Sequence, residues 1–255
     1  MRGKYKRYRS YAKAYKIYAQ RHFKRRYKMI SLINELPQIS AVSAESIKIN
    51  CLYDSYKNDP SVMFWAQDND KCLIAMTDGN MIIHNNNADT EELKEFVAVL
   101  SPVCVFSDID TLEAIDCLPD ENINVVWRKA DIVGDTPSDD LKSDELYALL
   151  DVDGLSLPDY PHFAVDFCRR KNLGFAKAFA IKDKCAVITF NSGNNAIING
   201  LASHEKGYGS VAIKGILQKN YGKDFYACCR DSVLPFYLKN GFIKLYNAGY
   251  WVKNK

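Results

Sequence analysis

The sequence has no hydrophobic run long enough to cross a membrane. No stretch approaches the roughly 20 apolar residues that a transmembrane helix needs, and the basic N-terminal region lacks the apolar segment and small-residue cleavage site of a secretory signal. We therefore expect a cytoplasmic protein without a membrane span. At 255 residues, of which 47% are hydrophobic, the chain can bury a substantial core.

The cysteines form no metal-binding or disulfide pattern. There are 8 of them, none in a C-x-x-C spacing, and most lie in apolar, strand-like segments such as KCLIAM and KCAVITF. Cys228 and Cys229 are adjacent, but neighbouring residues of a strand point to opposite faces, so the two thiols cannot chelate a metal together. We expect reduced, buried cysteines and no metal site.

Acidic residues are absent from residues 1–28, which contain 12 of the 34 Lys and Arg residues. The remaining 22 basic residues are outnumbered by 31 acidic ones, so a basic tail precedes an acidic body. Tyr8, Tyr11, Tyr15 and Tyr18 recur at helical spacing. Basic residues interleaved with aromatic ones suit RNA or an anionic surface as a partner.

Two other interpretations of this tail remain open. It could be a solvated segment held against the acidic body, or it could be upstream sequence preceding a true start at Met29. The segment MISLINELPQIS, which begins there, is typical of the start of a globular domain.

Glycine is scarce in the first half of the chain. Between residues 4 and 153 only Gly79 and Gly134 occur, whereas ten of the 13 glycines follow from Gly154 onward. Backbone approaches a ligand closely only where side chains are small or absent. We therefore expect a ligand-binding loop in the second half alone.

Strand patterns alternate with helix patterns and predict an α/β fold with a mixed sheet. The polar stretch VGDTPSDD, residues 133–140, is the best candidate linker. We predict a basic tail over 1–28, an α/β lobe over 29–135 and a second domain over 141–255. Expected helices are at 44–58, 90–100, 141–151, 158–172, 210–220 and 233–241; expected strands are at 61–67, 71–76, 81–85, 103–107, 124–130, 175–181, 185–190, 196–202, 224–230 and 243–252.

The segment HEKGYGS, residues 204–210, lies between a predicted strand and a predicted helix. A strand, a short glycine-rich turn and a helix bring free backbone N–H groups to the positive end of the helix dipole, where an anion can reach them. The triphosphate-binding pattern GxxxxGK[ST] and the dinucleotide-binding pattern GxGxxG are both missing. A phosphate site and a plain helix cap explain the segment equally well.

One helix and one strand further on comes LPFYLKNGF, residues 234–242. Together the two segments resemble the Gcn5-related N-acetyltransferases (GNATs), which carry Q/R-x-x-G-x-G/A after the fourth strand and roughly FYxxxGF after the fifth. The resemblance covers residues 155–255. The matching positions are Gly207 and Gly209 in the loop, and Phe236, Tyr237, Gly241 and Phe242 in the second motif.

The resemblance implies an α/β fold with a mixed, mostly antiparallel sheet flanked by helices, preceded by an N-terminal α/β lobe. It implies an N-acetyltransferase that moves an acetyl group from acetyl-CoA to a small-molecule or peptide amine by direct attack. The first half is compatible with a truncated, degenerate second copy, as in tandem GNATs. Lacking a glycine loop, that half is not expected to bind a second CoA.

The resemblance also implies roles for individual residues. The splayed fourth strand, which supplies N–H donors to the developing oxyanion, maps to Asn199, Gly200, Leu201 and Ala202. The diphosphate-binding N–H groups map to Lys206, Gly207, Tyr208, Gly209 and Ser210. Tyr237 is the expected catalytic residue, a proton donor to the departing CoA thiolate.

The sequence departs from the family pattern in the loop. His204 stands where Gln or Arg is usual, and Glu205 stands where glycine is common and would repel a diphosphate unless it points away. The base for the incoming ammonium is not identifiable among Glu205, Asp231 and His162. The alternative function is therefore a non-catalytic CoA- or RNA-binding module with a degenerate acetyltransferase fold.

Overall fold

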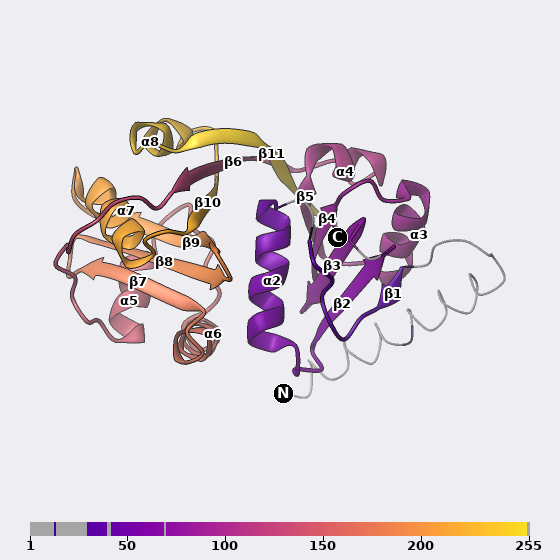
Figure 1. Ribbon diagram of the computed structural model, residues 1–255, viewed down its shortest axis with the longest axis horizontal. Coiled ribbons are helices and arrows are strands. Elements are labelled where there is room, and N and C mark those ends of the chain that lie inside the picture. The colour runs from indigo at the N-terminus through magenta and orange to yellow at the C-terminus, as the bar shows by residue number, and fades with distance from the viewer. Residues whose placement is uncertain (1–12, 14–29, 40–41, 69, 254–255) are drawn as a thin grey trace. The chain divides into compact units, whose positions relative to one another are not determined.

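The computed structural model describes residues 13, 30–39, 42–68 and 70–253. The chain forms two compact units (Figure 1): unit 1 runs as far as Ile123 and resumes at Tyr246, and unit 2 runs from Asn124 to Leu245. The predictions for the basic tail and for a start at Met29 rest almost entirely on residues outside the described ones.

The elements that begin in unit 1 alternate between strands and helices. They are β1 (Ser31–Leu32), α2 (Ala44–Tyr56), β2 (Val62–Gln67), β3 (Cys72–Thr77), β4 (Asn80–Asn85), α3 (Thr90–Leu100), β5 (Cys104–Asp108), α4 (Ile109–Ala114) and β6 (Glu121–Lys129). Those of unit 2 are α5 (Ser143–Leu150), α6 (Tyr160–Asn172), β7 (Ala176–Ile181), β8 (Cys185–Ser192), β9 (Asn195–Ser203), α7 (Tyr208–Lys219), β10 (Asp224–Cys229), α8 (Leu234–Lys239) and β11 (Ile243–Val252).

Each unit contains a mixed sheet with a single parallel strand pair among its described strands. In unit 1 the strand order is β1-β2-β3-β4-β5-β11, and only β4 and β5 are parallel. In unit 2 the order is β6-β10-β9-β8-β7, and only β9 and β10 are parallel. The predicted fold class, α/β with a mostly antiparallel sheet flanked by helices, is confirmed.

Local sequence explains the hairpin between β3 and β4. Asp78 and Gly79 both have positive φ, at 50° and 86°. Two successive residues with positive φ form the tight turn whose twist matches that of antiparallel strands, and Asp-Gly is a favoured pair there. The TDGN segment therefore sets the register in which Thr77 faces Asn80.

Helices cover both faces of the unit 1 sheet (Figure 1). Helix α2 packs on one face through a cluster that includes Ile49 and Phe64, whereas α3 and α4 pack on the other face against Trp65 and Ile74. Since successive side chains of a strand point to opposite faces, neighbouring residues of β2 and β3 serve the two cores. These strands consequently read as continuous apolar runs.

In unit 2, helices α7 and α8 share one core with the sheet, and α5 and α6 lie on the other face. Helix α7 approaches β7 closely. A Cβ atom added at Gly215 would lie 2.2 Å from the ring of Phe179, a separation that real atoms do not adopt. Glycine at this position therefore allows the helix to rest directly on the aromatic ring.

The two units repeat one order of elements and exchange their last strands. Three antiparallel strands, a helix, a parallel strand and a short helix occur in both. Strand β6, which follows α4, pairs with β10 of unit 2, and β11, which follows α8, pairs with β5 of unit 1. Among the described residues no helix is long and apolar enough to cross a membrane.

Candidate functional site

Strands β9 and β10 are parallel and paired only over their first residues. The last registered pair is Tyr226 with Ile197, yet β9 continues to Ser203 and β10 continues to Cys229. Beyond that pair no residues of the two strands are partners in the ladder. The strands thus diverge and leave strand-edge N–H and C=O groups available to a ligand.

A β-bulge lies on β9 just past the point of divergence. Ile198 faces Thr189 and Gly200 faces Ile188, so Asn199 is the extra residue of β9 and is exposed. A bulge changes which side chains and N–H groups face which way, and bulges are common beside active sites. Here the bulge turns Gly200 toward Leu155, whose Cδ2 atom would lie 3.5 Å from a Cβ atom at Gly200.

Helix α7 begins without a side-chain cap at the glycine-rich loop. Gly207 is its N-cap, with a left-handed φ of 93°. The N–H groups of Tyr208 and Ser210 donate within the loop, at 3.2 Å each, whereas those of Lys206, Gly207 and Gly209 donate to no group in the described part of the chain. The positive end of the α7 dipole therefore presents free N–H donors, as an anion site requires.

The two loop glycines serve different purposes. A Cβ atom at Gly207 would meet nothing within 4 Å, so the glycine is needed for its positive φ. A Cβ atom at Gly209 would lie 3.1 Å from the ring of Phe236, so this glycine lets the start of α7 pack against α8. The glycine-rich loop and the segment over residues 234–242 are therefore in direct contact with each other.

The two residues that depart from the family pattern have partners of their own. The carboxylate of Glu205 forms an ion pair with Lys184 and raises the pKa of that lysine. Its negative charge is therefore matched by a neighbouring cation. His204 donates from Nε2 to the carbonyl oxygen of Leu149 at 2.8 Å, near the C-terminal end of α5.

Tyr237 lies on α8 and is only 5% exposed. Its ring packs edge-on between Phe236 and Phe242, with centroid distances of 5.3 and 5.1 Å. Its hydroxyl makes no hydrogen bond to any described residue. Burial, followed by the nearby thiols of Cys229 and Cys228, raises the pKa of Tyr237, so that the hydroxyl holds its proton at neutral pH.

The three candidate bases are in different situations. Glu205 is already ion-paired, and His162 is paired with Asp159 at the exposed start of α6. Asp231 follows β10 directly and accepts a hydrogen bond of 2.7 Å from Nδ2 of Asn124. Glu205 and Asp231 each lie two residues beyond the end of a diverging strand, but Glu205 is ion-paired, whereas no ion pair of Asp231 occurs among the described residues.

The corresponding helix start in unit 1 is closed to anions. The side chain of Asp89 caps α3 by accepting from the N–H of Glu92, and Glu91 adds a further carboxylate in the first turn. Glu92 also accepts hydrogen bonds from the N–H of Ile30 and from Gln67 Nε2. The positive end of this helix dipole is therefore occupied by the protein's own acidic side chains.

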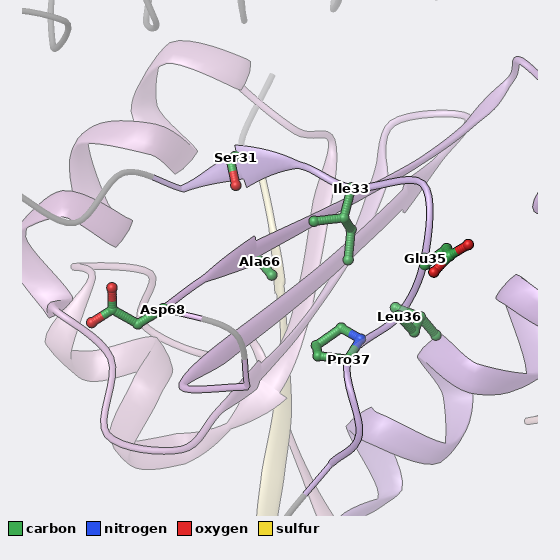
Figure 2. Close-up of a pocket in the computed structure, with 7 residues that line it drawn as sticks. All are labelled: Ser31, Ile33, Glu35, Leu36, Pro37, Ala66 and Asp68. Atoms are coloured by element: carbon green, nitrogen blue, oxygen red, sulfur yellow. The ribbon is translucent and has the colours of Figure 1, made fainter.

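Unit 1 also contains a shallow pocket of about 300 Å³ beside β1 and β2 (Figure 2). Its lining contains two carboxylates and no basic side chain, which does not suit an anionic cofactor. The lining residues are Ser31, Ile33, Glu35, Leu36, Pro37, Ala66 and Asp68. No group of three or more potential metal ligands occurs among the described residues.

The sequence matches no family model and no curated protein. Solved structures do resemble it. The GCN5-related N-acetyltransferase from Sphaerobacter thermophilus is 9% identical with a TM-score of 0.54, over 89% of this chain and 95% of that chain. A tandem GNAT protein from the clavulanic acid biosynthesis pathway, solved without AcCoA, is 10% identical with a TM-score of 0.51, over 85% and 89% of the two chains.

At these identities the likeness establishes the fold alone. The chain has the GNAT fold, as the loop and the FYLKNGF segment predicted. Since the tandem GNAT protein aligns with 85% of this chain, the likeness takes in both units.

Proposed function

We propose that the protein transfers an acetyl group from acetyl-CoA to an amine, and that unit 2 holds the acetyl-CoA. The observation that carries the proposal is the divergence of β9 and β10 directly before the uncapped start of α7. An elongated anionic thioester needs both features, a polar backbone edge for its acyl end and free N–H groups for its diphosphate. The structural likeness to acetyltransferases supports the same conclusion.

The loop is suited to hold the diphosphate. The free N–H groups of Lys206, Gly207 and Gly209 are the donors, and the side chain of Lys206 adds a positive charge beside them. Glu205 does not oppose this binding strongly, because Lys184 balances its charge.

The edge of β9 is suited to the acyl group. Acetyl-CoA supplies an activated thioester, and its carbonyl oxygen gains negative charge as an amine attacks. N–H groups of the bulged segment, from Asn199 to Ala202, are proposed to face that oxygen, because β10 no longer pairs with this part of the strand. Such fixed donors stabilise the developing charge more than they stabilise the bound substrate.

Tyr237 is suited to protonate the leaving thiolate. Burial keeps its hydroxyl protonated by raising its pKa, the hydroxyl has no hydrogen bond to a described residue, and the ring packs in the same core cluster as Cys229, the last residue of β10. General acid catalysis needs a donor of this kind within hydrogen-bond reach of the departing sulfur.

Thermal melting with and without acetyl-CoA tests the proposal. If the dissociation constant is near 10 μM, 1 mM acetyl-CoA stabilises the native state by about 2.7 kcal/mol and raises the melting temperature by several degrees. Gly207→Glu should abolish this shift, because it places a negative side chain among the diphosphate donors.

Gly222→Glu is the matched control. Gly222 has a φ of 84° and open space around its Cα, like Gly207, but lies in the turn before β10. Both variants lose comparable stability from backbone strain, about 1–2 kcal/mol, yet only Gly207→Glu should lose the ligand shift. An unchanged melting curve of the parent protein at saturating acetyl-CoA would contradict the proposal, and a shift without turnover of any amine would favour the non-catalytic alternative.

A further inference from the structure

A buried amide of β6 and an exposed carboxylate just after β10 form a pair. Asn124 is 2% exposed, and its Nδ2 atom donates to Asp231 Oδ1 at 2.7 Å and to the carbonyl oxygen of Cys229 at 3.3 Å. Its Oδ1 atom is buried and has no partner in the described part of the chain. Burying an amide with an unsatisfied oxygen is unfavourable, so the residue calls for a role beyond packing.

Apart from accepting from Asn124, the carboxylate of Asp231 has no structural partner among the described residues. Helix α8 has no side-chain cap, so the carboxylate of Asp231 does not serve one, and no ion pair of Asp231 occurs among the described residues. One carboxylate oxygen is fixed by the buried amide, and the other is open. The side chain therefore presents a carboxylate whose position is set by the buried amide of Asn124.

This charge lies close to the proposed site of acyl transfer. Burial, then Cys228 and Asp231, raises the pKa of Cys229 to about 11, and Cys229 in turn acts on Tyr237. The geometry agrees: Asn124 bonds both Asp231 and the carbonyl oxygen of Cys229, and Cys229 packs in the same core cluster as Tyr237 of α8.

The preceding residue ties the same turn to the segment that covers β9. Arg230 Nη1 donates to the carbonyl oxygen of Gly154 at 3.3 Å, and the neighbouring Leu155 packs over Gly200 of the bulge. The turn that carries Asp231 is thereby anchored beside the diverging strands.

We propose that Asp231 binds the ammonium group of the acceptor and takes its proton, and that Asn124 is a positioning residue that holds the Asp231 carboxylate toward that group. The inference rests on the function proposed above and specifies the acceptor as a cationic amine. Asn124 lies on β6, the strand that follows unit 1 in the chain, so the exchanged strand completes the site of unit 2.

The proton balance of the step is simple. The ammonium loses one proton to Asp231, and the resulting amine nitrogen forms a bond to the thioester carbon. The C–S bond then breaks, Tyr237 gives its proton to sulfur, and the second nitrogen proton restores the tyrosine. The products are the amide and free CoA thiol, and the proton on Asp231 passes to solvent.

The test uses the full chain and a panel of primary amines that includes spermidine, tyramine and a lysine-containing peptide. Initial rates are followed as thiol release from acetyl-CoA, and acetyl-CoA affinity is measured by calorimetry. Asp231→Asn should lower kcat/KM for the amine roughly 100- to 10,000-fold with acetyl-CoA affinity unchanged. Asp135→Asn, at an exposed carboxylate of the linker, is the matched control and should behave as the parent protein.

Two further variants separate charge from position. Asp231→Glu should restore part of the rate, because the charge returns on a longer side chain. Asn124→Ala should raise KM for the amine while acetyl-CoA affinity stays unchanged. If Asn124 were purely structural, its replacement would not raise KM for the amine selectively.

The outcomes distinguish this inference from the function on which it rests. A parent protein that acetylates an amine as fast as its Asp231→Asn variant overturns the role of Asp231 alone. Loss of acetyl-CoA affinity in Asp231→Asn also overturns it, since the residue would then serve the cofactor or the fold. A parent protein that acetylates no amine of the panel overturns the proposed transferase function and this inference with it.

Discussion

Replacing Tyr237 by Phe removes one hydroxyl and leaves every ring contact in place. The hydroxyl makes no hydrogen bond to a described residue, and the edge-on contacts with Phe236 and Phe242 persist in the variant. We therefore expect the free energy of unfolding to change by no more than about 0.5 kcal/mol. We also expect acetyl-CoA affinity to stay the same, because proton donation matters only as the C–S bond breaks.

Turnover should fall sharply in the same variant. General acid catalysis contributes roughly 100- to 10,000-fold, and a CoA thiol is a fairly good leaving group, so the low end applies. A loss of about 100-fold corresponds to about 2.7 kcal/mol of transition-state stabilisation. Because burial raises the pKa of Tyr237, the donor should also stay protonated at alkaline pH, where an exposed tyrosine would begin to ionise.

The assay compares turnover at saturating substrates with calorimetric acetyl-CoA affinity. Tyr221→Phe is the control, since Tyr221 is 62% exposed in the turn after α7. Equal turnover of Tyr237→Phe and the parent protein would show that Tyr237 only packs. Weaker acetyl-CoA binding with unchanged turnover at saturation would place it in the cofactor pocket without a proton-transfer role.

Two further predictions concern stability. Gly215→Ala should destabilise the protein by about 1–3 kcal/mol in urea unfolding, because its Cβ atom would overlap the ring of Phe179; an unchanged midpoint would mean that α7 shifts freely. Glu45→Gln should reduce the loss of stability on raising the pH from 4.5 to 7, measured by urea unfolding across that range. Burial raises the pKa of Glu45 above its ordinary value of 4.5, although Tyr246 donates a hydrogen bond to its carboxylate at 2.6 Å. The native state therefore binds the proton more tightly than the unfolded state does. Its stability consequently falls as the pH rises through that interval. His84, whose pKa burial lowers, contributes the opposite slope in both proteins, so identical pH profiles of the two would refute the assignment to Glu45.

Elements with strong local signals were predictable from sequence. The helix expected over 90–100 and the last strand expected over 243–252 coincide with α3 and β11. Capping by Asp89 and a left-handed C-cap at Ser101 define α3 locally. Helix α4 was missed, although Asp108 caps it, because six residues after a strand are too few to show a helical period.

The residues of the candidate site likewise divide into those that the sequence could predict and those that it could not. Gly207 and Tyr237 belong to contiguous motifs, so their positions could be predicted; their roles stay predictions. Asn124 carries no such signal, because its partner Asp231 is distant in the sequence and meets it only through the pairing of β6 with β10. The compensation of Glu205 by Lys184 likewise depends on the turn between β7 and β8, and no spacing rule links the two residues.

The strand exchange explains how the first half of the chain matters to the second half. A parallel strand pair leaves an outer edge on β5 in unit 1 and on β10 in unit 2, and an open edge invites unwanted pairing. Strand β11 covers β5, and β6 covers β10, so the first half of the chain supplies the strand that closes the sheet of unit 2. Carboxylates at the start of α3 can therefore block anion binding in unit 1 while β6 keeps both its pairing and Asn124.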